Sequence, residues 1–288
     1  MQPAKNTPLG GNYLLDCRGK LLDLHTPRVA GILNITEDSF YAGSRVHTDQ
    51  QILKAAGTML SEGASILDLG GQSSRPGALP VGEAEEREKV LRAIQIILEH
   101  FPDALVSVDT YSSGVAAAAI RAGASLINDI SAGRLDPDMI PLAGSLGVPY
   151  IAMHMQGEPA NMQEHPHYED VVREVLDFFI HKAFECASAG ISDLILDPGF
   201  GFGKSLEHNY TLLQHLDVFS MTGRPLMIGI SRKSMVYKPA GSGPQDALLG
   251  TTALHMLALE KGVSLLRVHD VKPALEAIRL FGFYQQQR

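Results

Sequence analysis

Cysteine is scarce in this sequence, and long apolar runs are absent. Only Cys17 and Cys186 occur, without the close spacing of a thiol metal site or redox pair. A disulfide between them stays open, but 288 residues can bury a core without one, so we expect a reducing cytoplasm. No segment reaches the roughly 20 apolar residues that a membrane span needs, and residues 1–11 lack an apolar signal core.

Positive charge is also in short supply. The formal net charge is −8 and the pI is about 5.7. Nucleic-acid binding needs a basic surface, so we expect no nucleic-acid partner, and any anion site must be built from a few cations in a cleft. Glycine and proline are scattered, which indicates no linker. We therefore expect one domain over residues 1–288, with an N-terminal extension and hairpin at 1–28.

A repeated design runs through the chain. Its units consist of a glycine that suits the left-handed end of a helix, a short apolar run, and a polar residue. Each apolar run is too short for a helix and is bounded like a buried strand. The units lie at 62–68, 122–128, 189–197 and 261–267, and further apolar runs lie between them at 29–33, 105–108, 150–153 and 226–230.

Helical patterns fill the gaps between these runs. The clearest one has a capping box of Thr48 and Gln51 at its start and Gly63 at its end. Eight strands that alternate with helices predict an α/β protein, a single (β/α)8 TIM barrel, with a doubly wound sheet as the alternative. Residues 13–24 predict a β-hairpin that turns at Arg18 and Gly19 and caps the bottom of the barrel.

Polar residues end nearly all of the predicted strands. In a barrel the carboxyl ends of the strands meet at the active-site mouth, so these side chains should converge on one pocket. One such residue alone could mark a strand that simply leaves the core, but the whole set favours an enzyme. The residues are Asn34, Asp68, Asp109, Asn128, His154, Asp197, Ser231 with Arg232 and Lys233, and Arg267.

The sequence around these strand ends resembles the dihydropteroate synthases. The matching strings follow the family's order, at 31–40, 70–78, 106–110, 127–129, 196–204, 231–234 and 267–270. The resemblance implies a TIM-barrel transferase of folate biosynthesis, a family that sulfonamides target. Its members condense 6-hydroxymethyl-7,8-dihydropterin pyrophosphate with p-aminobenzoate to give 7,8-dihydropteroate and pyrophosphate. It also implies Mg²⁺ and a homodimer, for which the apolar segments 248–259 and 273–283 would supply an interface.

The resemblance also assigns roles to residues. A carboxylate, an amide and a cation can pair with the edge of an amino-pyrimidine, and arginine suits phosphate because its fork donates two hydrogen bonds. The implied sites are Asp109, Asn128, Asp197, Lys233, Met153 and Gly229 for the pterin; Asn34, Arg75, Arg267 and His269 for pyrophosphate, with Asn34 also touching Mg²⁺; Ser74, Pro76, Phe202 and Ser234 for p-aminobenzoate; and Asp109, Lys233, Arg267 and Asp38 for catalysis.

The chemistry of the family fits these residue types. Pyrophosphate leaves before the amine attacks, and Asp109 and Asp38 would stabilise the pterin cation that remains. A neutral arylamine needs no strong general base and no covalent enzyme intermediate. Ser234 lies at the predicted start of a helix, where unpaired N–H groups suit the carboxylate of p-aminobenzoate.

Several alternatives stay open at this point. Arg75 and Arg267 could be solvated surface charges, and Asp197 could cap a helix that starts at Pro198. The glycines of 199–203 fail the spacing of a dinucleotide or P-loop motif. The histidines at 154, 165 and 167 with Glu169 fit no standard metal motif. A corrinoid methyltransferase barrel would need no pyrophosphate clamp, and a non-catalytic pterin binder would lack turnover.

Two loops depart from the family pattern, the first also at 41–44, where the family usually has Ser-Asp-Gly-Gly. Glu37 stands where the first loop usually has proline, which affects loop stiffness. In the second loop Gln72 replaces glutamate and Ser74 replaces threonine. Because both loops are expected to close over the substrates, we hypothesise that Ser74 alters the contact with p-aminobenzoate analogues such as sulfonamides.

Overall fold

An eight-stranded parallel sheet forms the centre of the part of the chain that the computed structural model describes, residues 13–35, 48–72, 81–159 and 161–287. Neighbouring strands follow one another along the chain, from β3 through β8, with β10 and then β9 on the other side of β3. The strands are β3 (Arg28–Asn34), β4 (Ile66–Gly70), β5 (Val106–Asp109), β6 (Leu126–Asp129), β7 (Tyr150–Met153), β8 (Leu194–Asp197), β9 (Met227–Ile228) and β10 (Leu265–Val268).

The two edges of this sheet meet. Leu196 of β8 forms a parallel bridge with Leu226, directly before β9, and its backbone N–H donates to the carbonyl of Pro225 at 3.0 Å. A doubly wound sheet reverses its strand order at a switch point, whereas this order is consecutive around a ring. The predicted TIM barrel is therefore confirmed, and the doubly wound alternative is wrong.

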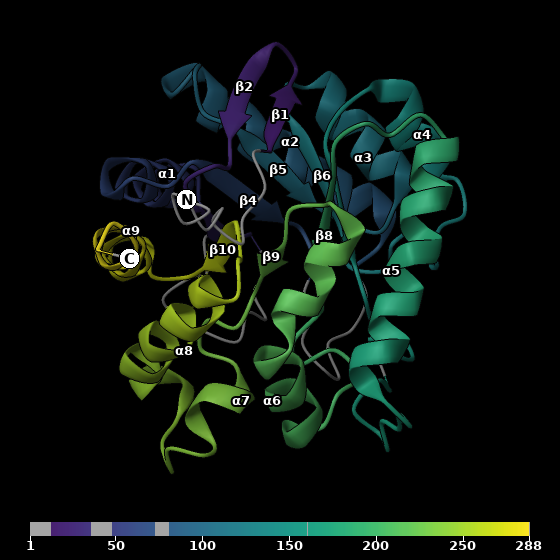
Figure 1. Ribbon diagram of the computed structural model, residues 1–288. Helices are drawn as coiled ribbons and strands as arrows, with labels where there is room; N and C mark the ends of the chain where they lie inside the picture. The colour runs from purple at the N-terminus through teal and green to yellow at the C-terminus, as the bar shows by residue number, and fades with distance from the viewer. Residues whose placement is uncertain (1–12, 36–47, 73–80, 160, 288) are drawn as a thin grey trace, which may run out of the picture.

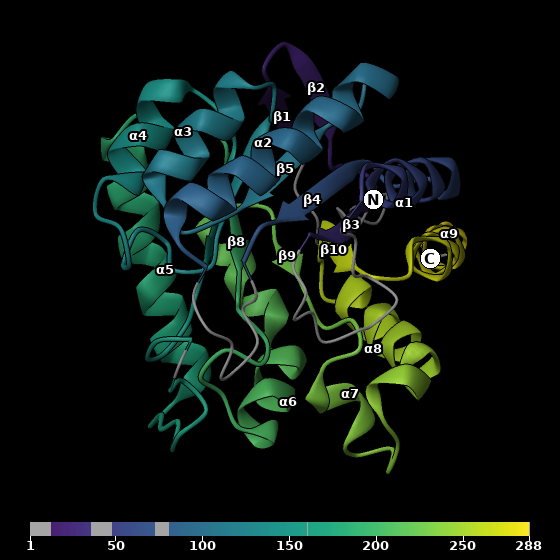
Figure 2. The same ribbon diagram turned by 180° about the vertical axis from the view of Figure 1, so that it is seen from behind.

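Helices surround the strands (Figures 1 and 2). At least one helix follows each barrel strand. They are α1 (Asp49–Glu62), α2 (Glu83–His100), α3 (Ser113–Arg121), α4 (Met139–Leu146), α5 (Val171–Ser188), α6 (Leu206–Gln214), α7 (Ser234–Tyr237), α8 (Leu248–Glu260) and α9 (Val271–Gln285), with short 3₁₀ turns at Leu216–Thr222 and Pro244–Asp246. These helices cover the outer face of the barrel.

The helix ends confirm the repeat. Thr48 and Gln51 form the predicted capping box of α1. The repeated glycines have positive φ, from 88° at Gly262 to 115° at Gly123, which other residues adopt only with strain. Each glycine therefore ends a helix and redirects the chain into a strand.

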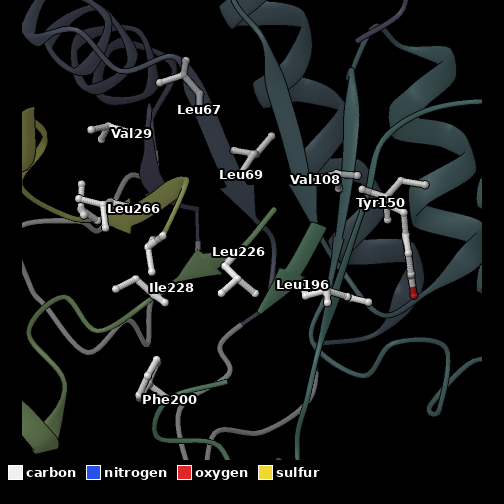
Figure 3. Close-up of a cluster of buried hydrophobic side chains, with 14 of the residues drawn as sticks. Val29, Leu67, Leu69, Val108, Tyr150, Leu196, Phe200, Leu226, Ile228 and Leu266 are labelled. Atoms are coloured by element: carbon white, nitrogen blue, oxygen red, sulfur yellow. The ribbon is translucent and has the colours of Figure 1, made fainter. Parts of the chain in front are cut away.

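Alternating side chains divide the buried residues into two layers. On β4, Leu67 and Leu69 face the helices and join the main core cluster, part of which is drawn in Figure 3. Ile66 instead belongs to a second cluster inside the barrel, with Ala30 and Leu126. Because side chains alternate along a strand, Asp68 also faces inward, above Ile66 and toward the carboxyl ends of the strands.

The N-terminal hairpin closes the opposite end of the barrel. β1 (Leu14–Cys17) and β2 (Lys20–Asp23) are antiparallel and turn at Arg18 and Gly19, as predicted. Leu15 and Leu22 pack with the interior cluster of Ile66. The guanidinium of Arg18 donates to the carbonyl of Ile120 at 2.8 Å, at the end of α3. Figure 1 shows the hairpin at the end opposite α6 and α7.

Two further features bear on the earlier expectations. β9 covers two residues, fewer than the run 226–230 predicts. The strand ends early because the chain turns after Ile230, whose carbonyl accepts a hydrogen bond from the backbone N–H of Lys233.

Cys17 and Cys186 are both buried and free, and burial raises the pKa of each thiol to about 12. Within the described ranges, none of the helices has the length and apolar character to cross a bilayer.

Candidate active site

Arg267 occupies the centre of the barrel mouth. Its Nε donates to Asp68 Oδ2 and its NH2 donates to Asp109 Oδ2, both at 2.5 Å. All three side chains are largely buried, with Arg267 only 16% exposed. Burial works against the charge of Arg267, but Asp68 and Asp109 outweigh it and raise its pKa. Arg267 is therefore a fixed cation of the site, and the alternative of a solvated surface charge is wrong.

Asn34 and Asp109 flank Gly70 at the ends of three adjacent strands. Gly70 is paired with Asn34 on one side and with Asp109 on the other. A β-carbon at Gly70 would lie 3.1 Å from Asn34 Oδ1 and 3.7 Å from Asp109 Oδ2. Several oxygen atoms therefore gather at this part of the rim.

Lys233 reaches the mouth from the end of the loop after β9. Its Nζ donates to the carbonyl of Phe200 at 2.6 Å and lies 4.6 Å from the centre of the Phe202 ring. A β-carbon at Gly229 would lie 3.8 Å from Lys233 Nζ and 3.7 Å from Arg267 Cδ. Gly229 thus lies beside the side chains of both cations and adds no side chain of its own there.

The ionisable groups of the mouth are strongly perturbed by burial. Burial raises the pKa of Asp109 to about 7, although Arg267 opposes the shift. It raises the pKa of Asp197, which Lys233 opposes. Burial lowers the pKa of Lys233 to about 8, although Asp197 counteracts part of this. Perturbed acids and bases in one cleft are typical of functional sites.

His269 is held as a neutral imidazole. Burial and the charge of Arg267 lower its pKa to about 4. The Oγ of Ser231 accepts from the His269 backbone N–H at 3.2 Å and lies 3.1 Å from its Nδ1. When the Ser231 hydroxyl donates a hydrogen bond to Nδ1, the proton of the neutral ring lies on Nε2. His269 is therefore suited to donate a hydrogen bond rather than to act as a charge.

Arg232 fixes the loop that carries Lys233. It pairs with both carboxylate oxygens of Asp270, at 2.7 and 2.9 Å, and donates to the carbonyls of Pro244 and Gln245. Arg232 is 7% exposed and has a φ of 56°. This bidentate pair joins the loop after β9 to the start of α9.

The glycine-rich segment after β8 is held by Lys204. Its Nζ is buried and contacts the carbonyls of Gly199 and Phe202, both at 3.1 Å, and His154 Nδ1 at 2.9 Å. Burial lowers the pKa of Lys204 to about 7. The first helix after this segment is α6, which Ser205 caps. The alternative that Asp197 caps a helix at Pro198 is therefore wrong, since Asp197 accepts from the N–H of Gly199.

An apolar wall completes one side of the mouth. Met153 and Phe202 pack in one cluster with Ile130, Met155 and Met162. Met153 comes from the end of β7 and Phe202 from the loop after β8. The wall thereby joins a residue assigned to the pterin with one assigned to p-aminobenzoate.

The sequence-predicted site residues fall into two groups. The structure places ten of them at the carboxyl ends of the strands or in the loops that follow: Asn34, Asp109, Asn128, Met153, Asp197, Phe202, Gly229, Lys233, Arg267 and His269. Ser234 is exposed and begins α7, as predicted, although that helix has only four residues. Asp38, Ser74, Arg75 and Pro76 lie outside the described residues.

Sequence reasoning left some residues of the site without a role. Asp68 was recognised as a strand end, but its partners come from strands far away in the sequence. Arg232 and Lys204 were likewise named only within motifs. Gln72, a departure from the family, donates to Glu86 Oε2 at 2.5 Å and accepts from the Tyr111 hydroxyl at 2.8 Å.

Among residues 13–35, 48–72, 81–159 and 161–287, no group of three or more histidine, cysteine, aspartate or glutamate side chains could hold a metal ion. His154 contacts the ammonium of Lys204 and packs edge-on against Phe178. Asn34 offers an amide oxygen at the rim, which suits a hard cation that takes its other ligands from phosphate and water.

This barrel, with buried carboxylates, an amide and two cations at its mouth, matches the family model described as pterin binding enzyme over residues 30–269. The dihydropteroate synthase of Escherichia coli is 42% identical over 92% of this chain and 94% of its own. The chain belongs to the dihydropteroate synthase family.

Solved structures agree with this placement. The Yersinia pestis dihydropteroate synthase, in a sulfonamide complex, is 42% identical and superposes with a TM-score of 0.91 over 96% of this chain and 100% of its own. The Xanthomonas albilineans enzyme with 4-aminobenzoic acid is 39% identical, with a TM-score of 0.88 over 96% of this chain and 99% of its own.

The segment after β8 gives a stability prediction. Gly199 has a φ of 68°, and a β-carbon there would lie 1.9 Å from the carbonyl oxygen of His154. Gly223 has a φ of 65° with nothing within 4 Å. Gly223→Ala should cost about 1–2 kcal/mol in unfolding free energy from the left-handed strain alone. Gly199→Ala should cost a further 1–3 kcal/mol or so from the clash.

Urea unfolding of the two variants measures the difference. Equal losses of unfolding free energy in both would show that the backbone of His154 does not confine this segment.

Proposed function

We propose that the barrel mouth condenses 6-hydroxymethyl-7,8-dihydropterin pyrophosphate with p-aminobenzoate, with the residue roles given below. The observation that carries this assignment is the position of Arg267, whose guanidinium donates to two buried carboxylates and whose side chain lies beside Gly229. One pocket thus offers acceptors for a flat heterocycle and a cation for a leaving diphosphate.

The pterin is proposed to lie between Asp197, Asn128 and Lys233. The amino-pyrimidine edge presents N–H donors and one carbonyl, which a carboxylate, an amide and an ammonium can pair. Gly229 has no side chain to fill the space beside the cations, and Met153 offers an apolar contact. A buried edge left unpaired costs about 1–3 kcal/mol per group, so this pairing favours pterins over less complementary rings.

Pyrophosphate is proposed to leave toward Arg267, His269 and Asn34. Arg267 supplies fixed charge, and neutral His269 donates a hydrogen bond through Nε2. Asn34 Oδ1 would hold Mg²⁺ together with the phosphate oxygens. When bound, the ion would stabilise the negative charge that develops on the leaving group.

The bond that breaks joins the hydroxymethyl carbon to pyrophosphate, which departs with the electron pair. Asp109 lies on the same rim and, when ionised, offsets the positive charge left on the pterin. The lone pair of the arylamine then forms the new C–N bond, and the amine loses one proton. No covalent bond to the protein is required.

The p-aminobenzoate ring is proposed to pack against Phe202, with its carboxylate near Ser234. The Xanthomonas relative with 4-aminobenzoic acid supports a site of this kind in this fold. Lys233 lies 4.6 Å from the centre of the Phe202 ring, so a single side chain connects the two substrate positions.

A coupled assay tests the activity itself. The enzyme is mixed with dihydropterin pyrophosphate, Mg²⁺ and p-aminobenzoate, and pyrophosphate and dihydropteroate are measured together. We expect both products in equal amounts, with no dihydropteroate formed when the amine is omitted. The synthase assignment would be removed by the absence of release, or by pyrophosphate release that gives no dihydropteroate when the amine is present; the former outcome is expected of a non-catalytic pterin binder.

The perturbed pKa values predict a bell-shaped pH profile for kcat/KM of the pterin substrate. Asp109 must be ionised, so activity should fall as pH drops through about 7, and Lys233 must be charged, so activity should fall as pH rises through about 8. Asp109→Asn should lower activity and remove the acid limb. Lys233→Arg should remove the alkaline limb because guanidinium stays charged.

These two variants also separate the enzyme's groups from the substrate phosphate, which itself titrates near pH 6 or so. Limbs that persist unchanged in both variants would assign the profile to the substrate or to other groups of the mouth, such as Lys204 and Asp197, and not to Asp109 and Lys233.

We also propose a cytoplasmic homodimer that forms through α8 and α9. The two helices pack together and expose Leu249, Leu257, Leu280 and Phe283, each more than half accessible. Exposed apolar side chains on two neighbouring helices are typical of an interface. The two buried free thiols suit a reducing compartment.

Leu249→Glu should therefore give a monomer in sedimentation velocity, because the charge would be buried at the interface. Phe184→Glu is the matched control, since Phe184 is 77% exposed on α5, across the barrel from α8 and α9 (Figure 1). A dimer that survives Leu249→Glu, or that Phe184→Glu disrupts, would place the interface elsewhere.

A further inference from the structure

Asp68 is the buried carboxylate on which two functional side chains converge. Its side chain is 2% exposed. Its Oδ2 accepts from Arg267 Nε at 2.5 Å and from Asn128 Nδ2 at 3.1 Å. An ionised carboxylate only accepts hydrogen bonds. Both neighbours must therefore turn N–H groups toward Asp68.

This requirement fixes the amide of Asn128. An amide carries its oxygen and its nitrogen on opposite sides. With Nδ2 directed at Asp68, Oδ1 must point away from it. Asn128 is 3% exposed, and its Oδ1 makes no hydrogen bond within the part of the chain that the structure describes. This orientation of the amide follows from the donor that Asp68 requires.

We propose that Asp68 is a positioning residue that sets the specificity of the mouth for a 2-amino heterocycle. It holds Asn128 so that the amide oxygen faces the ligand as an acceptor for the amino group. The inference rests on the pterin site proposed above and deepens it. Asp197 supplies a second acceptor, so the site contains two acceptors matched to a donor edge.

Arg267 makes Asp68 difficult to replace. An asparagine at position 68 has only one acceptor oxygen. With that oxygen at the position of Oδ2, the new amide nitrogen would lie 3.4 Å from Asn128 Nδ2, so two donors would face each other. With the amide reversed, Arg267 Nε would face a donor. Either Asn128 would rotate and direct its own N–H groups at the ligand, or Arg267 would lose an acceptor. Asp68→Asn should therefore relax the discrimination between an amino and an oxo group at the ligand.

Binding of two matched ligands tests this directly. The probes are 6-hydroxymethylpterin, which has a 2-amino group, and 6-hydroxymethyllumazine, which has a 2-oxo group, and calorimetry gives their affinity ratio. Wild type should prefer the pterin, and Asp68→Asn should reduce the ratio about tenfold or more, since the preference comes from buried groups left unpaired. A simple loss of folding would weaken both ligands alike.

Ser107→Ala is the matched control. Ser107 is paired with Asp68 on the adjacent strand, is fully buried, and its Oγ has no partner within the described ranges. Its removal should leave the ratio unchanged. If Ser107→Ala reduced the affinity ratio as much as Asp68→Asn does, any change at this level of the barrel would alter selectivity. The proposal would then be wrong.

A double-mutant cycle with Asn128→Ala isolates the interaction. Asn128→Ala should reduce the ratio as Asp68→Asn does, and the double variant should lose no more. Should Asp68→Asn not fold, Asn128→Ala decides alone, because an unchanged ratio there overturns the proposal. If the wild-type enzyme binds neither ligand and releases no pyrophosphate, both the proposed function and this inference are wrong. If the wild-type enzyme is active but Asp68→Asn leaves the affinity ratio unchanged, only this inference is wrong.

Discussion

The contact of one guanidinium with two carboxylates holds the mouth of this barrel in its working form. Arg267 is separated from Asp68 by 199 positions and from Asp109 by 158. Only the closed ring of strands brings them together. A buried ion pair is costly to desolvate and is retained where its geometry is good and its remaining hydrogen bonds are made. Here Asn128 supplies one of those hydrogen bonds to Asp68.

The same contact links the two halves of the proposed reaction. In the proposed reaction, Asp109 and Asp197 would lie beside the pterin, whereas Arg267 and His269 would lie toward the leaving group. Charge separation in the transition state would then develop between buried groups, of which Arg267 and Asp109 are already paired. Such preorganised groups need little rearrangement at the moment of reaction. The bond of Arg232 to Asp270 holds the loop that carries Lys233, and the bond of Lys204 to the carbonyl of Phe202 holds the loop that carries Phe202.

Much of the fold follows from patterns that are local in the sequence. Gly63, Gly123, Gly190 and Gly262 mark helix ends, and the polar residue after each apolar run marks a strand end. Barrel geometry then predicts that those ends meet. The pairing between them does not follow, because nothing near Asp68 in the sequence identifies Arg267 and Asn128 as its partners. β9 was shorter than its apolar run suggests because a turn, and not hydrophobicity, ends it.

The roles of individual residues came from the family resemblance, and the structure adds the physical constraints on them. His269 was assigned to the pyrophosphate site with Asn34, Arg75 and Arg267, and burial and the charge of Arg267 lower its pKa, which favours the neutral imidazole. The contribution of the first and second loops depends on residues outside the described ranges, such as Asp38 and Arg75.

The most direct measurement of the central claim is kcat for Arg267→Lys at saturating substrates, with folding verified by urea denaturation. A lysine keeps one positive charge but cannot hold two carboxylates and a phosphate in a planar fork. If Arg267 is the fixed cation for the leaving pyrophosphate, kcat should fall about 100-fold or more. A folded variant with nearly wild-type kcat would contradict the account.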